Sequence, residues 1–454
     1  ANSLRFNDGS SDNLLRSPSS SGNRQIFTFS AWIKRSAISS STTYAIAYFG
    51  ATATTSGTTV IRLVNDALQV YIRDGASNKL LTTNRLFRDV SAWYHIVVAI
   101  DTTQGTDTNR VKLYVNGVQE TSFSSSQYPT QNLNSNVNTS GQNNRFGVYA
   151  DSGGSLESYY DGYMAECVLI DGQQLAPDQF GEFDDSGIWK PIDVSGLTFG
   201  TNGFYLDFEN SGALGADVSG NSNNFTVNNL TAVDQSTDTC TNNFATWNPL
   251  NVNDNMGTFH HGNLEYETSV SSFRTAFATF GASQGKWYFE CKRITGTSFA
   301  IGIISLDYKN RTKNVSYIGG AGDATNNIGY MKDGNTSIGG SETSGYASYG
   351  NGDTVMVAMD IDNGKVYFGV NGTWGNSGDP TSGATGTGAR SFTPSGETWT
   401  FGVSVFNSHW EANFGSPMYS ISSGNTDADG HGNMEFAVPS GYFVLNSKNL
   451  AEYG

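Results

Sequence analysis

Apolar and polar residues alternate along much of this chain, and this period of two is what most limits its fold. In the first half it covers Phe27 to Ile33, Trp93 to Ile100 and Val111 to Val115, and in the second half Val355 to Ile361 and Val366 to Val370. Successive side chains of a β-strand point to opposite faces of a sheet, so each stretch predicts a strand with one buried face. Apolar stripes with a helical period are nearly absent. The chain is therefore predicted to be all-β.

Two hairpins of the same kind end on the same tripeptide. The order strand, turn, strand, Val-Asn-Gly occurs at 93–118 and again at 353–372. Asn-Gly readily adopts the positive φ angles that a tight hairpin turn requires. The repetition predicts two related antiparallel β-sandwiches of the jelly-roll type in tandem.

Composition agrees with this architecture and suggests where the domains end. The 454 residues include 53 glycines, 13% aromatic and 15% charged residues, which is typical of short strands joined by tight turns and unlike disordered chains. The stretch 210–247 is rich in Asn, Ser, Thr and Gly. We therefore predict a sandwich over 1–209, an irregular connector over 210–247 and a second sandwich over 248–454, with one helical turn at 176–181.

Charge and cysteine content exclude several classes of partner. A net charge of -16 repels phosphate backbones and anionic membranes, and no apolar stretch is long enough to span a bilayer. We expect no nucleic-acid partner and no membrane insertion. Cys167, Cys240 and Cys291 are widely spaced and odd in number, which indicates small buried residues, and not a disulfide framework, in a chain that folds in a reducing cytoplasm.

Catalytic patterns are not recognisable in the sequence. Glycoside hydrolysis uses two nearby carboxylates, but the strand acids Glu166 and Glu290 stand alone. Glu182, Asp184 and Asp185 come closest to a pair, in a segment that is expected to be a loop. We predict no enzymatic activity.

Cofactor motifs are not recognisable either. His260 and His261 are adjacent, yet no Cys, His or carboxylate stands at zinc spacing beside them, so a surface turn is the preferred interpretation. No phosphate-binding glycine loop and no nucleophile elbow is present. No cofactor is predicted.

Two families resemble the two halves. The first half resembles laminin-G-like, concanavalin A-like jelly rolls through Phe29 to Lys34, Trp93 to Val97, Val111 to Val118 and Gly162 to Glu166. The second half resembles SPRY-type sandwiches, through the segments Gly285–Glu290, Ala300–Ile303, Gly352–Trp374 and Glu411–Gly415. The resemblance implies binding folds, and SPRY-type domains bind proteins through loops at one end.

The chain as a whole resembles marine bacteriophage structural proteins that join these two modules. The marks are Asn2–Asn7, Asp171–Gln173, Gly181–Asp184, Trp189–Pro191, Gly200–Leu206, Asp217–Phe225 and Thr241–Thr246. The resemblance implies a virion component that is made and folded in the host cytoplasm: a tail fibre, a tail spike or a head-surface protein. Other virion proteins and a host surface glycan or receptor are the implied partners. A homo-oligomer is expected, and trimers are common in such roles.

Laminin-G-like domains often carry a calcium ion at a loop rim. Asp101, Asp151 and Asp161 are the loop acids that could bind one, because calcium prefers carboxylate and carbonyl oxygens. The alternative is that these residues only begin turns. We assign no ion to them.

Sugars are held by aromatic faces with polar groups beside them. Asp161 and Asn371 lie next to aromatic residues in predicted loops, and Trp374 follows a hairpin turn where burial is least natural. Packing in the core is the alternative for each aromatic. The candidate aromatic residues are Tyr159, Tyr160, Tyr317, Tyr330, Tyr346, Trp374 and Trp410.

Three functions agree with these features. The first is a non-enzymatic virion surface protein that binds a host glycan or receptor through its sandwich loops. The second is a decoration or cement protein of the capsid or tail that contacts other virion proteins. The third is a secreted carbohydrate-binding adhesin or glycosidase.

Overall fold

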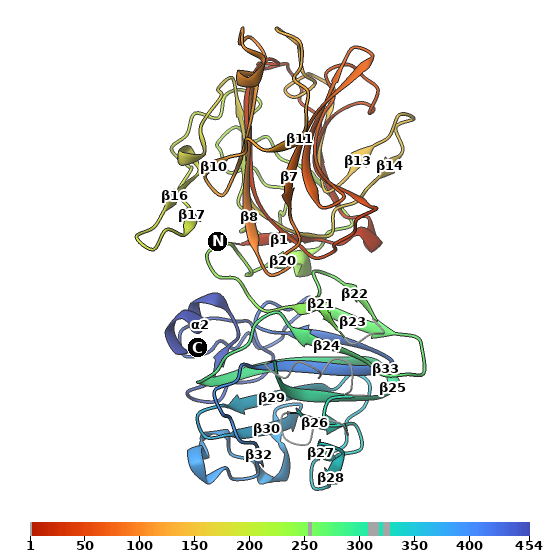
Figure 1. Ribbon diagram of the computed structural model, residues 1–454, viewed down its shortest axis with the longest axis vertical. Helices are drawn as coiled ribbons and strands as arrows, with labels where there is room; N and C mark the ends of the chain where they lie inside the picture. Colours follow the sequence, from red (N-terminus) through yellow and green to blue (C-terminus); the bar gives the residue numbers. More distant parts are fainter. Residues whose placement is uncertain (1, 253–256, 307–316, 321–326) are drawn as a thin grey trace. The chain divides into compact units, whose positions relative to one another are not determined.

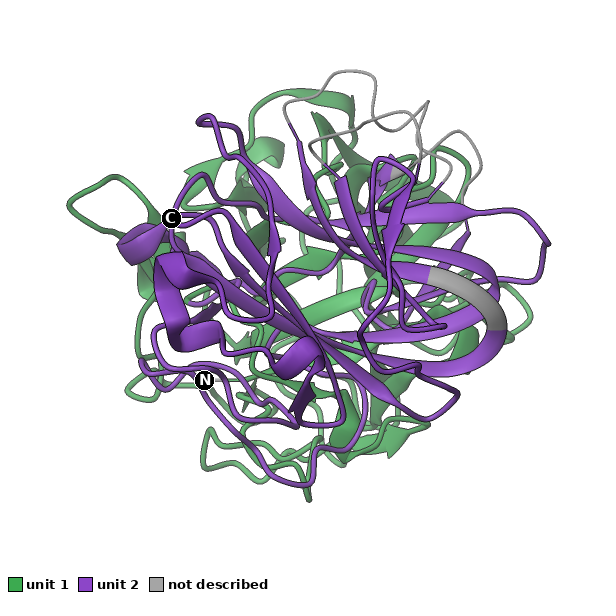
Figure 2. Cartoon of the chain, turned by 90° about the horizontal axis from the view of Figure 1, so that it is seen from below, with its two compact units in different colours: residues 1–241 green, residues 242–454 purple. Residues whose placement is uncertain are grey.

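The computed structural model describes residues 2–252, 257–306, 317–320 and 327–454. The chain divides into two compact units, Ala1–Thr241 and Asn242–Gly454 (Figure 2). Strands are the main regular structure of each unit, and nearly all of them pair antiparallel. The predicted all-β architecture of two tandem sandwiches is confirmed.

Two eight-stranded sheets form the first unit (Figure 1). In spatial order the first sheet contains β10 (Val118–Gln119), β9 (Val111–Val115), β8 (Trp93–Asp101), β3 (Ile26–Arg35), β15 (Gly162–Asp171), β1 (Ser3–Phe6) and β20 (Gln235–Ser236), with β18 (Phe204–Leu206) also paired to β15. The second sheet contains β11 (Phe123–Ser126), β7 (Ser77–Leu86), β6 (Ala67–Asp74), β5 (Thr59–Val64), β4 (Thr43–Gly50), β12 (Asn143–Phe146), β2 (Asn13–Arg16) and β19 (Thr226–Asn228).

Two short hairpins and several 3-10 turns complete this unit. Two small hairpins are formed by β13 (Tyr149–Ala150) with β14 (Leu156–Glu157) and by β16 (Gly181–Phe183) with β17 (Trp189–Pro191). The 3-10 turns are η1 (Asp8–Ser10), η2 (Asp107–Asn109), η3 (Pro177–Gln179) and η4 (Ala232–Asp234). The helical turn expected at 176–181 is therefore η3, followed directly by β16.

The alternating pattern places one face of each strand in a core between the two sheets. Phe29 of β3 stacks on Phe146 of β12 with ring centroids 5.8 Å apart, and both side chains are buried. Fully burying such a side chain stabilises the fold by about 1.5–3 kcal/mol. The opposite face of the first sheet is also covered, because Val97 and Val168 pack against Phe180 and Val194 of the segment after η3.

The structure places residues 210–241 of the expected connector inside the first unit. The isolated apolar residues of this stretch, Leu214, Phe225 and Leu230, are buried in the unit's core. Their neighbours pair with the sheets, since β19 adds to β2 and β20 adds to β1. The stretch that the sequence predicts to be an irregular connector thus adds a strand to each of the two sheets.

The described strands of the second unit join in one 14-stranded sheet organised by two long neighbours, β25 (Lys286–Ser305) and β33 (Trp399–Asn413). The first part of β25 pairs with β29 (Thr354–Asp360) and its last part with β26 (Asn327–Met331). The pairing of β25 with β33 shifts register between Arg293 and Thr295. Such a bulge bends the strand, so that it can contribute to both layers of a sandwich.

The remaining elements of this unit are short. The strands are β21 (Trp247–Val252), β22 (Thr258–His260), β23 (Glu265–Thr268), β24 (Arg274–Ala278), β26 (Asn327–Met331), β27 (Thr336–Ile338), β28 (Ser341–Thr343), β29 (Thr354–Asp360), β30 (Lys365–Val370), β31 (Thr373–Trp374), β32 (Arg390–Ser391) and β34 (Phe443–Val444). The helical elements are η5 (Gly375–Ser377), η6 (Pro380–Thr385) and α2 (Ser447–Tyr453). Aromatic residues fill the core, where Phe289 stacks on Phe414 with ring centroids 5.1 Å apart.

Candidate binding site

The outer face of the second sheet in the first unit carries a row of tyrosines and arginines. The strand register aligns Arg145 with Tyr48 and continues across the sheet through Val60, Tyr71 and Leu80. Directly opposed residues share a face, so this row lies on one surface of the sheet. Because Ile61, Val70 and Phe146 point into the core between the sheets, the row lies on the side away from it.

A second row runs beside the first and is held by hydrogen bonds. Arg62 donates from Nε and Nη2 to Gln69 Oε1 at 2.9 and 2.7 Å, and Gln69 Nε2 donates to Thr82 Oγ1 at 2.9 Å. The guanidinium of Arg62 lies over the rings of Tyr71 and Tyr149, 5.1 and 5.7 Å from their centroids. We call Tyr48, Arg62, Gln69, Tyr71, Arg145 and Tyr149 the Tyr–Arg face.

The β13–β14 hairpin supplies the outermost aromatic group of this face. Tyr149 meets Tyr48 edge-on at 5.8 Å, and it remains partly exposed while Tyr48 is fully buried. Arg145 is also partly exposed, and its Nε makes no hydrogen bond among the described residues. Burial is the main cause that lowers the pKa of Arg62 and of Arg145. The face therefore presents an aromatic ring next to a partly exposed guanidinium group.

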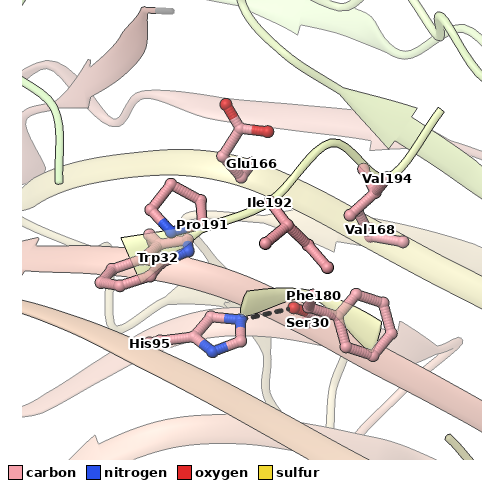
Figure 3. A pocket seen from close by; sticks show the side chains of 9 residues that line it. All are labelled: Ser30, Trp32, His95, Glu166, Val168, Phe180, Pro191, Ile192 and Val194. Atoms are coloured by element: carbon pink, nitrogen blue, oxygen red, sulfur yellow. Dashed lines mark hydrogen bonds between the residues drawn. The ribbon is translucent and has the colours of Figure 1, made fainter. Parts of the chain in front are cut away.

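The pocket on the outer side of the first sheet contains a serine next to a histidine (Figure 3). Trp189 Nε1 lies 3.0 Å from His95 Nδ1, and Ser30 Oγ lies 2.8 Å from His95 Nε2. An indole N–H can only donate, so Nδ1 accepts and Nε2 carries the proton that is donated to Ser30. Burial lowers the pKa of His95 to about 3. A histidine in this tautomer cannot deprotonate Ser30, so the pair is not an activated nucleophile.

Family models match both units. Residues 8–177 match the concanavalin A-like lectin/glucanases superfamily. Residues 286–414 match the SPRY domain. The chain thus contains a region similar to concanavalin A-like domains and a region similar to SPRY domains. Both are of carbohydrate-binding or protein-interaction type.

Solved structures show partial similarity to the chain. The SPRY domain of human HERC1 is 12% identical, with 37% of this chain and 96% of that chain covered at a TM-score of 0.29. The heptameric SAP-like pentraxin from Limulus polyphemus is 17% identical, with 39% and 79% covered at a TM-score of 0.29. A human SPRY domain is 14% identical, with 35% and 92% covered at a TM-score of 0.24. No curated protein matches the chain.

Predicted ligand residues of the concanavalin A-like domain lie in different environments. Tyr159 is partly exposed and interacts electrostatically with Arg145 of the Tyr–Arg face. Tyr160 lies in a loop as expected, but its side chain is fully buried and donates from its hydroxyl to the Lys34 carbonyl at 3.0 Å, so it is not exposed to a ligand. Asp161 is buried as well, and burial is the main cause that raises the pKa of this carboxyl well above its usual range.

The other two candidate calcium ligands cap turns. Asp101 Oδ1 accepts from Thr103 N at 3.0 Å. Asp151 Oδ1 accepts from Gly153 N and from Ser155 N, both at 2.8 Å. This is the turn chemistry given as the alternative to calcium binding. Calcium stays unassigned at these acids.

Three predicted aromatics of the SPRY domain meet in its interior. Tyr330 is fully buried and lies 5.7 Å from the partly exposed ring of Tyr346. Trp410 is also fully buried, and Tyr349 lies between it and Tyr330, at 5.9 and 5.0 Å. Trp410 and Tyr330 are strand residues of β33 and β26, so the sequence-based placement in loops was wrong for both.

The remaining candidates stay at least partly exposed. Asn371 is exposed, and its Nδ2 donates to Asp353 Oδ1 at 2.7 Å. Trp374 is half-buried against Tyr288, with ring centroids 6.3 Å apart. Tyr317 is half-buried against Phe273. None of these three shares an aromatic contact with another of them among the described residues, so the structure shows no joint site for them.

The loop acids considered for catalysis form part of a hairpin turn. Asp184 Oδ1 accepts from Ser186 N and Ile188 N, both at 2.9 Å, while Glu182 and Asp185 are exposed. Backbone capping accounts for the position of Asp184.

In the described part of the chain, no helix is long and apolar enough to cross a bilayer.

Proposed function

We propose that this protein is a non-enzymatic attachment protein of a bacteriophage virion, which binds a host-cell glycan through the Tyr–Arg face. The observation that carries the proposal is the arrangement of Tyr149, Arg62 and Arg145 on the exposed side of a lectin-type sandwich. The sequence motifs shared with phage structural proteins support a place on the virion.

The chemistry of this face suits a sugar. A tyrosine ring offers an apolar surface for the C–H groups of a pyranose, and its hydroxyl can bond at the wet edge. The N–H groups of Arg145 can donate to ring hydroxyls or to a carboxylate. Gln69 holds Arg62 in place, which lowers the entropy cost of binding.

The SPRY domain has a separate role in this proposal, which is contact with other virion proteins. The protein folds in the host cytoplasm and joins the particle as a homo-oligomer. It needs no cofactor for attachment.

One observation favours the alternative of a decoration or cement protein. The β16–β17 hairpin carries Phe183 and Ile188, which are 53% and 63% exposed. Large apolar side chains that are exposed and lie close together on one hairpin are typical of surfaces that another protein covers. In that case the hairpin would contact a neighbouring virion protein, and particles without the protein would be fragile.

The glycan proposal is tested with the full-length protein on an array of host surface polysaccharides. We expect Tyr149→Ala and Arg145→Ala each to lower the affinity by about 10-fold or more, which corresponds to about 1.4 kcal/mol. Arg88→Ala is the matched control, since this arginine is 56% exposed and its partner Asp66 keeps an ion pair with Arg35. Equal binding by all three variants, or no binding by the native protein, would refute the role of this face.

A further inference from the structure

Histidines and glutamates from three strands share one face of the second unit. The register pairs His260 of β22 with Glu265 of β23, and Glu265 with Glu411 of β33. It also pairs Glu267 of β23 with His409 of β33. Directly opposed residues and residues two apart on a strand point to the same side, so all five side chains leave the sheet on one face. The intervening Tyr266 and Trp410 point to the core.

The side chains converge closely. His409 Nε2 lies 3.2 Å from Glu265 Oε1, and His260 Nε2 lies 3.6 Å from Glu267 Oε1. One ligand atom each from His260, Glu265 and Glu267 fall within 4.8 Å of one another. His261 Nε2 reaches the second oxygen of Glu265 at 3.5 Å. The strands β22, β23 and β33 that bring them together are adjacent (Figure 1).

These separations match those of ligands around one metal ion. Zinc binds His nitrogen and carboxylate oxygen at about 2.0–2.1 Å in a tetrahedron, so its ligand atoms stand about 3.3 Å apart. The two N···O distances above fall on either side of that value. Imidazole together with carboxylate selects zinc and similar divalent transition metals over calcium or magnesium, which prefer oxygen alone.

The Nε2 atom of His409 has the surroundings of a metal ligand. The Nε2 atom of His409 is buried and makes no hydrogen bond among the described residues, although Glu265 Oε1 is near. A buried polar atom without a hydrogen bond is costly, and a metal ion would satisfy it.

We propose that His260, Glu265 and Glu267, whose ligand atoms already converge, bind one divalent transition-metal ion of the zinc class on this face, and that His409, beside Glu265, joins them as a further ligand. This inference does not depend on the glycan-binding proposal, because it concerns the other unit. The bound ion would fix the β22–β23 hairpin to β33, which lies more than 130 residues later in the chain.

Electrostatics support a cation at this position. Three carboxylates, of Glu265, Glu267 and Glu411, lie on the face with Lys292 as the nearby basic residue. A divalent cation would offset the repulsion among the carboxylates.

The test is a zinc titration of the full-length, chelator-treated protein by calorimetry, with Co²⁺ as a second probe whose visible spectrum reports tetrahedral coordination. We expect one zinc ion per chain with micromolar or tighter affinity. His260→Gln, His409→Gln and Glu267→Gln should each weaken zinc binding by about 10-fold or more. Calcium and magnesium in excess should not compete.

His431→Gln is the matched control, since this histidine lies in the same unit, is partly exposed and is outside the cluster. It should bind zinc like the native protein. Thermal unfolding without metal checks that each variant is folded, and it should show equal midpoints for His431→Gln and the native chain. Absence of zinc binding by the native protein, or equal binding by folded His260→Gln and His409→Gln, would overturn the proposal.

Discussion

The two units use the same turn for different purposes. Asn116 and Asn371 both adopt positive φ, at 48° and 47°, and each is followed by a glycine with positive φ. Asn116 N and Oδ1 bond the backbone of His95, and Asn371 N and Oδ1 bond the backbone of Thr354 in the same way. An aromatic ring closes over the glycine in both cases, from Trp189 in one unit and Phe436 in the other.

The side chain that this turn supports differs between the units. In the first unit it is His95, which stacks between Trp32 and Trp189 at 4.8 and 5.9 Å and is fully buried. In the second unit the equivalent residue is Thr354, and histidines gather elsewhere on a charged face. The same turn therefore supports a buried structural histidine in the first unit and a threonine in the second.

The largest expected effect comes from replacing His95, the side chain by which the two turns differ. His95→Ala removes a ring from between two indoles and leaves the Trp189 N–H unpaired, so it should lower the free energy of unfolding of the first unit by about 3–4 kcal/mol. Hydrogen exchange followed by mass spectrometry should show faster exchange in residues 1–241 and unchanged exchange in residues 242–454. Equal acceleration in both units would contradict the independence of the two cores.

Acidification should act on the same residue. Burial lowers the pKa of His95 to about 3, from about 6.5 in an unfolded chain. The folded unit therefore binds fewer protons at His95 than the unfolded one. The contribution of neutral His95 to the free energy of unfolding is thus complete above about pH 6.5 and is lost as the pH falls. At pH 5 the loss amounts to about 2 kcal/mol.

The measurement is the difference between the native protein and His95→Gln at pH 7 and at pH 5. Gln can accept the Trp189 N–H but does not titrate, so the native protein should lose more stability than the variant. Asp12, whose pKa burial raises to about 6, titrates in both proteins and cancels in the difference. A pH-independent difference would show that His95 is protonated more easily than its burial implies.

The smallest effect sharpens the comparison at the shared turn. Asn116→Ala and Asn371→Ala each put alanine into a left-handed backbone that asparagine tolerates better, and each removes the Oδ1 hydrogen bond to the facing strand. Each should therefore cost about 1–2 kcal/mol. Unit-resolved hydrogen exchange should give values for the two units that agree with each other. If only one of the two substitutions lowers the free energy of unfolding, the two turns have the same geometry but contribute differently to stability.

The sequence predicted the strands, the two sandwiches and this turn, because period-two patterns and Asn-Gly pairs act locally. Trp410 was wrongly predicted to lie in a loop, although the alternation of polar and apolar residues from His409 to Phe414 is that of a strand with Trp410 on its buried face. The Tyr–Arg face was missed for a related reason. Tyr48, Arg62 and Arg145 come together only through cross-strand register, although Tyr159 was selected near it.

The histidine and glutamate face was hidden by sequence distance. The sequence predicts a surface turn for His260 and His261, because no Cys, His or carboxylate stands at zinc spacing beside them. His409 reaches the cluster from β33, and only the pairing of β23 with β33 reveals it. A search for ligands at short spacing cannot find such a site.

The most direct test of the central claim is adsorption of host cells by particles that carry Tyr149→Ala together with Arg145→Ala, compared with particles that carry Arg88→Ala. The account predicts intact particles in both cases, with adsorption lost only for the double variant. Normal adsorption by the double variant would contradict glycan attachment through the Tyr–Arg face, and fragile particles with normal adsorption would favour the decoration role instead.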